Sequence, residues 1–152
     1  AGGQPHAMPM DRSQGSQRGE GGYEPAANQT GIVLPTYQNW YQKSQDTVTY
    51  NPSQADQILQ TAGFAKGSNG IYQSASGQQL AFTIKTISGY TDWDASLAVV
   101  KQQLKPVGID LTVSDLAQQT FYDRPYNGTF DLAYYGQAGG PTPYHRLRPN
   151  LS

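Results

Sequence analysis

The feature of this sequence that most constrains its fold is a double change of hydrophobic period just after its midpoint. Leu80, Phe82 and Ile84 alternate with smaller or polar residues at the period of a β-strand. Residues 92–107 then place apolar side chains at helical spacing, and "GIDLTV" (108–113) reads as a strand again. A strand, a helix and a strand in one sheet make a right-handed crossover, so we predict that the two strands are parallel neighbours.

The helix of this crossover is the expected anchor of the core. It is predicted to begin near Asp92 and to end at Gly108, where a left-handed residue is usual. Pro106 lies in the last turn and is expected to shorten the helix. Burial of each large apolar side chain contributes about 1.5–3 kcal/mol. The predicted buried stripe consists of Trp93, Leu97, Val100 and Leu104.

A second helix is predicted earlier in the chain, over residues 52–62. Asn51 can cap its start and Pro52 suits the first helical position. Gly63 follows as the stop. The residues that share its apolar stripe are Ala55, Ile58, Leu59 and Ala62.

The remaining elements complete an alternation of helices and strands. A hairpin is expected from Ile71 through the turn "SASG" (74–77) into the strand that holds Leu80. "DLAQQTFYDRPY" (115–126) is predicted to form a weaker helix, and "FDLAYY" (130–135) a third strand. The predicted fold class is therefore α/β, with a mixed sheet and covering helices.

Residues 1–31 differ in composition from the rest of the chain. They are rich in Gly, Gln, Ser and Pro and show no apolar period. Such a segment cannot bury enough surface to offset its ordering entropy, so we expect it to be disordered or loosely attached. The α/β domain is expected to occupy residues 32–152.

Composition excludes several classes of function. The sequence has no cysteine, which rules out disulfides, thiol catalysis and thiolate metal sites. A net charge of −1 offers no electrostatic footprint for nucleic acid or an anionic membrane, so no nucleic-acid partner is expected. No apolar run approaches the length of about 20 residues that spans a bilayer.

The titratable residues do not form a catalytic pattern. His6 and His145 have no partner at metal-ligand spacing and are interpreted as solvent-exposed. Asp92 and Asp94 lie at a helix start, where carboxylates cap and complement the helix dipole. Asp131 opens a strand and is expected to close a turn. We therefore predict no catalytic residue, no metal and no cofactor, with a hydrolase lobe acting through these aspartates as an alternative.

The strongest candidate site is the loop "GQAGGPTPY" (136–144), which follows the strand 130–135. In open α/β sheets, ligands bind beyond the carboxyl ends of the strands. Glycines allow a backbone to approach a ligand closely, and tyrosines present flat apolar faces with a polar tip. A simple surface connection is the alternative reading of this loop. The predicted ligand-binding residues are Tyr134, Tyr135, Gly136, Gln137, Gly139, Gly140, Thr142 and Tyr144.

Four blocks of the sequence follow one another in a recognisable order, namely "YNPSQADQILQTAGF", "GQQLAFTI", "AVVKQQLKPVGIDLTV" and "YNGTFDLAYYG". Each block is ordinary alone, but their order and spacing resemble those of the extracytoplasmic solute-binding proteins of bacterial ABC importers, family 5, which bind peptides, nickel or oligosaccharides. "DRSQ" (11–14) also resembles the Asp-Arg start of a helix in that family.

The resemblance implies a fragment of the C-terminal lobe of a two-lobed receptor, with residues 32–152 forming a partial lobe truncated at its C-terminal end. It implies an extracytoplasmic monomer that captures a peptide and delivers it to a membrane permease, without covalent chemistry. In the peptide-binding members the loop after the Phe-Asp strand carries a tryptophan and an aspartate, and residues 136–144 have neither. An oligosaccharide is therefore the alternative ligand, and a non-functional truncated fragment is a further alternative.

Overall fold

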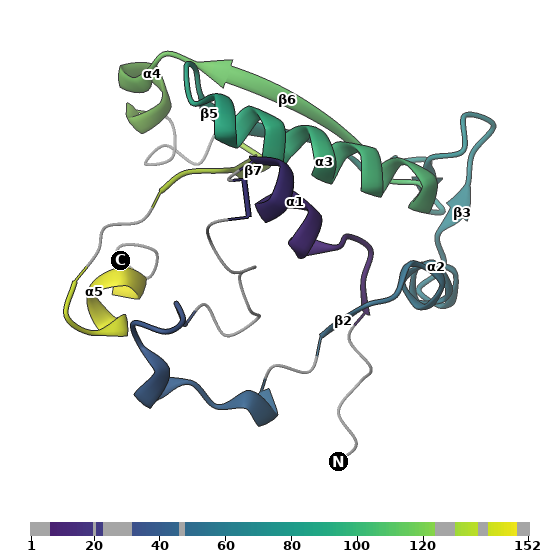
Figure 1. The fold of residues 1–152 in the computed structure, drawn as a ribbon. Coiled ribbons are helices and arrows are strands. Elements are labelled where there is room, and N and C mark those ends of the chain that lie inside the picture. Colours follow the sequence, from purple (N-terminus) through teal and green to yellow (C-terminus); the bar gives the residue numbers. More distant parts are fainter. Residues whose placement is uncertain are drawn as a thin grey trace.

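A three-stranded parallel sheet is the largest of the described sheets and lies towards one side of the fold (Figure 1). The structure is a computed structural model, and it describes residues 7–19, 21–22, 32–45, 48–123, 130–136 and 140–148. The strand order is β6-β5-β7. β5 (Ala81–Ile87) pairs with β6 (Asp110–Leu116) along its whole length, and with β7 (Leu132–Ala133) over two residues. Both pairings are parallel, which confirms the predicted crossover.

Helix α3 (Thr91–Val107) connects β5 to β6 and packs against the sheet. It continues through Pro106 to Val107, so the proline does not end it. Gly108 follows with φ 93°, and its N–H donates to the carbonyls of Leu104 and Lys105, which closes the last turn as predicted.

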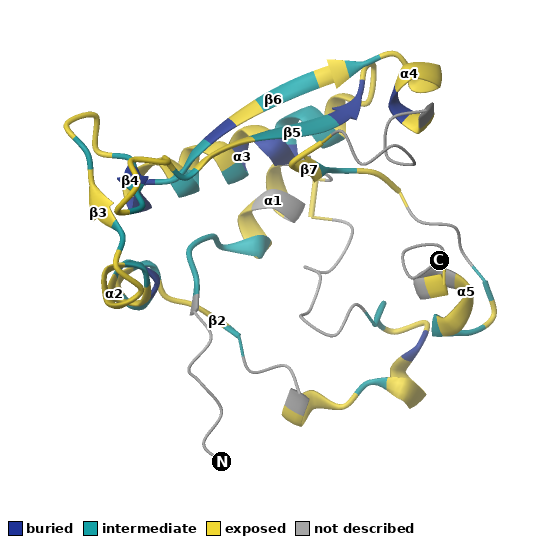
Figure 2. Ribbon diagram, turned by 180° about the vertical axis from the view of Figure 1, so that it is seen from behind, coloured by how far each residue is buried: buried dark blue, intermediate teal, exposed yellow. Residues whose placement is uncertain are grey.

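The buried face of α3 is wider than the predicted stripe. Leu97 is only 1% exposed, whereas Trp93, Val100 and Leu104 are half-buried. Val99 is buried on another side of the helix, because α3 packs against α1 (Arg12–Gly19) as well as against the strands. Figure 1 shows α1 on the side of α3 away from the sheet. Figure 2 shows buried positions in β5, β6 and α3, and further ones in β4 and α4.

Helix α1 lies inside the segment 1–31, for which we expected disorder or loose attachment. Asp11 starts it, because its Oδ1 accepts the backbone N–H of Ser13 at 3.0 Å. The backbone N–H of Asp11 in turn donates to Gln103 Oε1 on α3 at 2.6 Å. β1 (Ala7–Met8) pairs in parallel with β2 (Thr49–Tyr50). Residues 7–19 thus form β1 and α1, and polar contacts rather than an apolar stripe join α1 to α3.

Helix α2 (Pro52–Thr61) begins and ends close to the predicted residues. The side chain of Asn51 accepts the N–H of Gln54 at 3.0 Å, and Gly63 has φ 87°. Its predicted apolar stripe is only partly covered: Ala55 is buried, but Ile58 is exposed. α2 lies at one end of the fold, against β1 and the end of α3, so few of its side chains are enclosed.

The predicted hairpin from Ile71 into the strand of Leu80 is reduced to a single antiparallel bridge, and the antiparallel sheet belongs to a different hairpin that precedes it. β3 (Ala65–Lys66) and β4 (Tyr72–Gln73) form a two-stranded antiparallel sheet. Gln73 then bridges Gln79 in an antiparallel sense across the predicted turn. Phe82, one of the alternating apolar residues of the next strand, is 38% exposed. The fold is thus α/β with parallel and antiparallel pairs, as predicted, although its central sheet is wholly parallel.

Short elements complete the described chain. α4 (Gln118–Asp123) follows β6 and corresponds to the weaker helix that was predicted there. The 3₁₀ turns η1 (Gln38–Trp40) and η2 (Lys43–Gln45) precede β2, and α5 (Pro143–Leu147) lies near the end of the chain. No helix of the described residues is both long enough and apolar enough to cross a bilayer.

Candidate functional site

The carboxyl ends of the three parallel strands meet at one edge of the sheet, which we call the carboxyl edge. Two backbone hydrogen bonds continue the pairing past the strand ends. The N–H of Ser88 donates to the carbonyl of Leu116, and that of Tyr134 to the carbonyl of Lys85, both at 2.8 Å. The segments that leave β5 and β7 therefore start side by side, where open α/β sheets bind ligands.

An aromatic cluster lies at the carboxyl edge and joins two of these segments. The rings of Tyr90 and Trp93 are stacked, with centroids 4.5 Å apart and an interplanar angle of 23°. Tyr134 meets Trp93 edge to face, with centroids 5.5 Å apart. We call Tyr90, Trp93 and Tyr134 the Trp93 cluster. A Cβ atom added to Gly136 would lie 3.5 Å from Trp93 Cζ2, so this glycine also faces the indole.

Tyr135 takes part in a second aromatic group. Its ring centroid is 6.0 Å from that of Phe121 in α4, and Phe121 also meets Tyr122 at 5.6 Å. Phe121 is buried, whereas Tyr122 and Tyr135 are exposed. Successive side chains of an extended chain point to opposite sides, so Tyr134 turns towards α3 and Tyr135 towards α4.

The second half of the predicted loop has different neighbours. The hydroxyl of Tyr37 donates to the carbonyl of Gly140, and Thr142 Oγ1 lies 3.0 Å from His145 Nδ1. A Cβ atom on Gly140 would overlap the Cβ of His145, so local packing requires a glycine there. Tyr144 is 63% exposed and its ring lies beside that of His145.

The eight predicted site residues therefore fall into three sets. Tyr134, Tyr135 and Gly136 lie at the carboxyl edge, next to aromatic residues of α3 and α4. Gly140, Thr142 and Tyr144 lie in the α5 segment. Gln137 and Gly139 lie outside the described residues. The role of all eight residues in ligand binding stays a prediction.

The aspartates at the site have structural surroundings. Asp131 Oδ2 accepts the N–H of Thr83 at 2.9 Å, which fixes the start of β7 against β5. This position is level with Thr83, about four strand residues or roughly 13 Å before the end of β5, whereas Asp92 and Asp94 lie beyond that end. Glycoside hydrolysis needs two carboxyls about 5–9.5 Å apart across a cleft, whereas Asp131 is engaged with the backbone of β5 and Asp92 and Asp94 lie in the first turn of α3.

Asp94 lies next to the Trp93 cluster and has a buried carboxylate oxygen. Its N–H donates to the carbonyl of Tyr90 at 3.1 Å, which joins the helix start to the Trp93 cluster. Its Oδ1 is buried and has no hydrogen-bond partner within the part of the chain that the structure describes. Over the same residues, no group of three His, Cys, Asp or Glu side chains is placed to hold a metal ion.

Tyr90 is a residue of the candidate site that was not predicted from the sequence, and Trp93 was assigned to the core alone. Only the pairing of β5 with β7 brings these residues to Tyr134, which lies more than forty positions further along the chain. A usable signal was present, since Tyr90 lies three residues after Ile87, the last residue of β5. Ligands of open α/β sheets bind beyond the carboxyl ends of the strands, and this rule applies to the end of β5 as well as to the strand 130–135.

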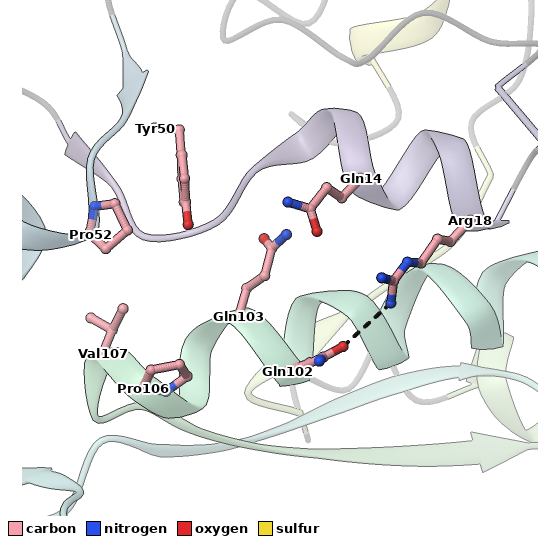
Figure 3. Close-up of a pocket in the computed structure, with 8 residues that line it drawn as sticks. All are labelled: Gln14, Arg18, Tyr50, Pro52, Gln102, Gln103, Pro106 and Val107. Carbon is pink, nitrogen blue, oxygen red and sulfur yellow. Dashed lines mark hydrogen bonds between the residues drawn. The ribbon is translucent and has the colours of Figure 1, made fainter.

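A concavity lies between α1 and the C-terminal half of α3 (Figure 3), and its lining contains none of the residues of the Trp93 cluster. Its volume is about 270 Å³. Arg18 Nη1 donates to Gln102 Oε1 at 3.5 Å, and Gln103 holds the backbone of Asp11. Its polar side chains thus hold the two helices together. The lining consists of Gln14, Arg18, Tyr50, Pro52, Gln102, Gln103, Pro106 and Val107.

Comparison with known proteins decides the family of this fold. Residues 7–151 match the family described as "Bacterial extracellular solute-binding proteins, family 5 Middle". The chain belongs to this family. Family 5 membership agrees with the resemblance seen in the four sequence blocks.

The relatives of this family 5 chain are much longer proteins. A probable ABC transporter-binding protein of Deinococcus radiodurans is 31% identical over 126 residues, which cover 78% of this chain and 21% of that protein. The mannohexaose-bound periplasmic oligopeptide-binding protein of Thermotoga maritima superposes with a TM-score of 0.82 at 25% identity, over 93% of this chain and 28% of that one. For the oligopeptide-binding protein AppA of Bacillus subtilis, in complex with a nonapeptide, the TM-score is 0.68 at 26% identity, over 82% of this chain and 25% of that one. The family 5 chain described here therefore spans about a quarter of these relatives, as part of an α/β lobe.

Proposed function

We propose that this chain supplies one wall of the ligand site of a solute-binding protein, which captures a solute outside the cytoplasm and delivers it to an ABC permease in the membrane. The observation that supports this proposal is the Trp93 cluster at the carboxyl edge, together with Tyr135 and Gly136. Flat aromatic faces at this edge suit non-covalent capture. Closure of a second lobe over this wall would be driven by ligand contacts made in the closed state.

A peptide is the first ligand class that we propose. The Bacillus subtilis relative was solved with a nonapeptide, and the shared fold covers 82% of this chain and 25% of that relative. Extended peptides can hydrogen-bond to the backbone at a strand end, while their side chains rest on aromatic residues such as Tyr134 and Tyr135.

An oligosaccharide is the second ligand class, and a specific observation favours it. The described residues 130–136 and 140–144 contain one acidic side chain, Asp131, whose Oδ2 already accepts the N–H of Thr83. A carboxylate that could hold a peptide amino terminus is thus absent from this described part of the loop. The Thermotoga maritima relative was solved with mannohexaose, a neutral ligand rich in hydroxyl groups.

Isothermal titration calorimetry of the protein that carries this chain, in its complete reading frame, tests the proposal. The solutes are short peptides, manno- and gluco-oligosaccharides, and nickel ions. Saturable binding of at least one of them, together with stimulation of the cognate permease's ATPase by the loaded protein, is the expected result. If none of these solutes binds, the proposed function is wrong.

A further inference from the structure

The ring of Tyr90 has one covered face and one open face. The indole of Trp93 covers the inner face, with centroids 4.5 Å apart and planes within 23° of parallel. Tyr90 is nevertheless 41% exposed. Because the stacked neighbour hides one side, the exposure comes from the outer face and the hydroxyl end of the ring.

Trp93 holds the ring of Tyr90 in place by stacking against it. Its indole is fixed by Tyr134, which meets it at right angles, and by the backbone at Gly136. The backbone of Tyr90 is fixed as well, since its carbonyl accepts the N–H of Asp94 in the first turn of α3. A rigid aromatic surface with two rotatable side-chain bonds loses little entropy when a ligand settles on it.

The open face of Tyr90 fits a rigid ring better than a peptide side chain. One face of a pyranose ring is lined by C–H groups and its rim carries hydroxyls, which matches an aromatic face with a polar tip. An oligosaccharide presents such a ring at every unit, whereas the side chains of a peptide differ from one position to the next. The residues of the cluster, Tyr90, Trp93 and Tyr134, are also uncharged.

We propose that Tyr90 is the platform on which one pyranose ring of a bound oligosaccharide stacks, and that Trp93 is a positioning residue that holds the platform flat. This inference rests on the proposed function and narrows its ligand to a neutral sugar oligomer. Neither residue belongs to the loop in which the sequence located the binding residues.

Calorimetric titrations of the complete protein with mannohexaose and with a hexapeptide test the inference. Tyr90→Ala removes the platform and is expected to weaken mannohexaose binding about five- to tenfold, the size of one aromatic stacking contact. Tyr90→Phe keeps the ring and is expected to stay within about twofold of the natural protein. Tyr122→Ala is the matched control, because Tyr122 is equally exposed but packs on Phe121.

Trp93→Phe separates positioning from a purely structural role. If Trp93 acts through Tyr90, this substitution weakens sugar binding in the natural background and has no further effect in the Tyr90→Ala background. A loss of the same size in both backgrounds would contradict the positioning role. Urea unfolding of each variant shows whether any loss of binding reflects unfolding instead.

The outcomes distinguish this inference from the proposed function. Binding of mannohexaose that is unchanged by Tyr90→Ala would overturn the platform. Binding of the hexapeptide without any oligosaccharide would overturn the inference and leave solute capture standing. A protein that binds no solute of either class would count against both.

Discussion

The phenol hydroxyl of Tyr72 donates a hydrogen bond of 2.7 Å to Asp56 Oδ1 and so ties the β3–β4 hairpin to helix α2. Tyr72 is almost completely buried, and Lys66 of β3 completes the connection, with its Nζ 3.0 Å from the same carboxylate oxygen. The ammonium also lies over the Tyr72 ring, 5.0 Å from its centroid. These contacts thus stabilise the β3–β4 hairpin and helix α2 against each other, although each element has few buried side chains of its own.

This connection predicts a dependence of stability on pH. The hydrogen bond from Tyr72, followed by that from Lys66, holds the pKa of Asp56 below its ordinary value of 3.8. A carboxyl whose pKa is lower in the folded state contributes stability that is fully present above the unfolded pKa and is lost as the pH falls through the folded one. We expect the urea midpoint of the chain to fall as the pH is lowered below about 4.

Asp56→Asn isolates the contribution of this carboxyl. The variant is expected to be less stable than the natural chain at about pH 6, and the difference should shrink as the pH falls below about 4. Asp11→Asn is the comparison, because hydrogen bonds from Ser13 lower the pKa of Asp11 as well, at a separate place in the fold. A pH profile that Asp56→Asn leaves parallel to that of the natural chain would contradict the assignment.

Gly108 is predicted to resist substitution more strongly than other glycines with positive φ. It has φ 93°, and an added Cβ would lie 2.9 Å from Tyr72 Cδ2 and 3.0 Å from the carbonyl oxygen of Gly70. Gly77 has φ 85° but faces open space, so Gly77→Ala measures the backbone cost alone. That cost is about 1–2 kcal/mol, and we expect Gly108→Ala to lose roughly a further 1–3 kcal/mol of unfolding free energy through overpacking.

Urea unfolding of the two alanine variants checks this prediction. Equal losses for Gly108→Ala and Gly77→Ala would show that the crowding around Tyr72 is relieved without cost. The comparison also tests the hairpin, because the N–H of Tyr72 donates to the carbonyl of Gly108 at 2.8 Å.

Leu97 carries the packing of α3 on the sheet. It is 1% exposed, and Leu97→Ala is expected to lower the free energy of unfolding by about 2–5 kcal/mol, since transfer and cavity costs add. Ile58→Ala is the control on α2, where the side chain is 41% exposed and the expected loss is below about 1 kcal/mol. Similar losses at both positions would mean that α2 is covered more fully than the described residues show.

Much of the central α/β unit could be predicted because its signals are local. The period of α3, the left-handed position of Gly108 and the cap at Asn51 each depend on a few adjacent residues. The parallel pairing of β5 with β6 then follows from the handedness of the crossover. Hydrogen bonds within a few residues and one rule of topology were sufficient for this part of the fold.

The rest depends on pairs that are distant in the chain. Helix α1 has no apolar stripe, and its place on α3 depends on hydrogen bonds between Asp11 and Gln103. Trp93 and Tyr134 meet only because β7 is the strand next to β5. A local pattern cannot distinguish an apolar residue that packs inside the core from one that packs at the sheet edge. For this reason the sequence indicated the edge but not the Trp93 cluster.

Hydrogen-exchange mass spectrometry of the complete protein, with and without a solute found by calorimetry, tests the central claim most directly. The claim is that solute binds to this chain at the carboxyl edge, and not in the concavity between α1 and α3. We predict slower exchange on binding in residues 88–94 and 130–136, with no change in residues 102–107. Protection of residues 102–107 without protection of residues 88–94 would contradict the account.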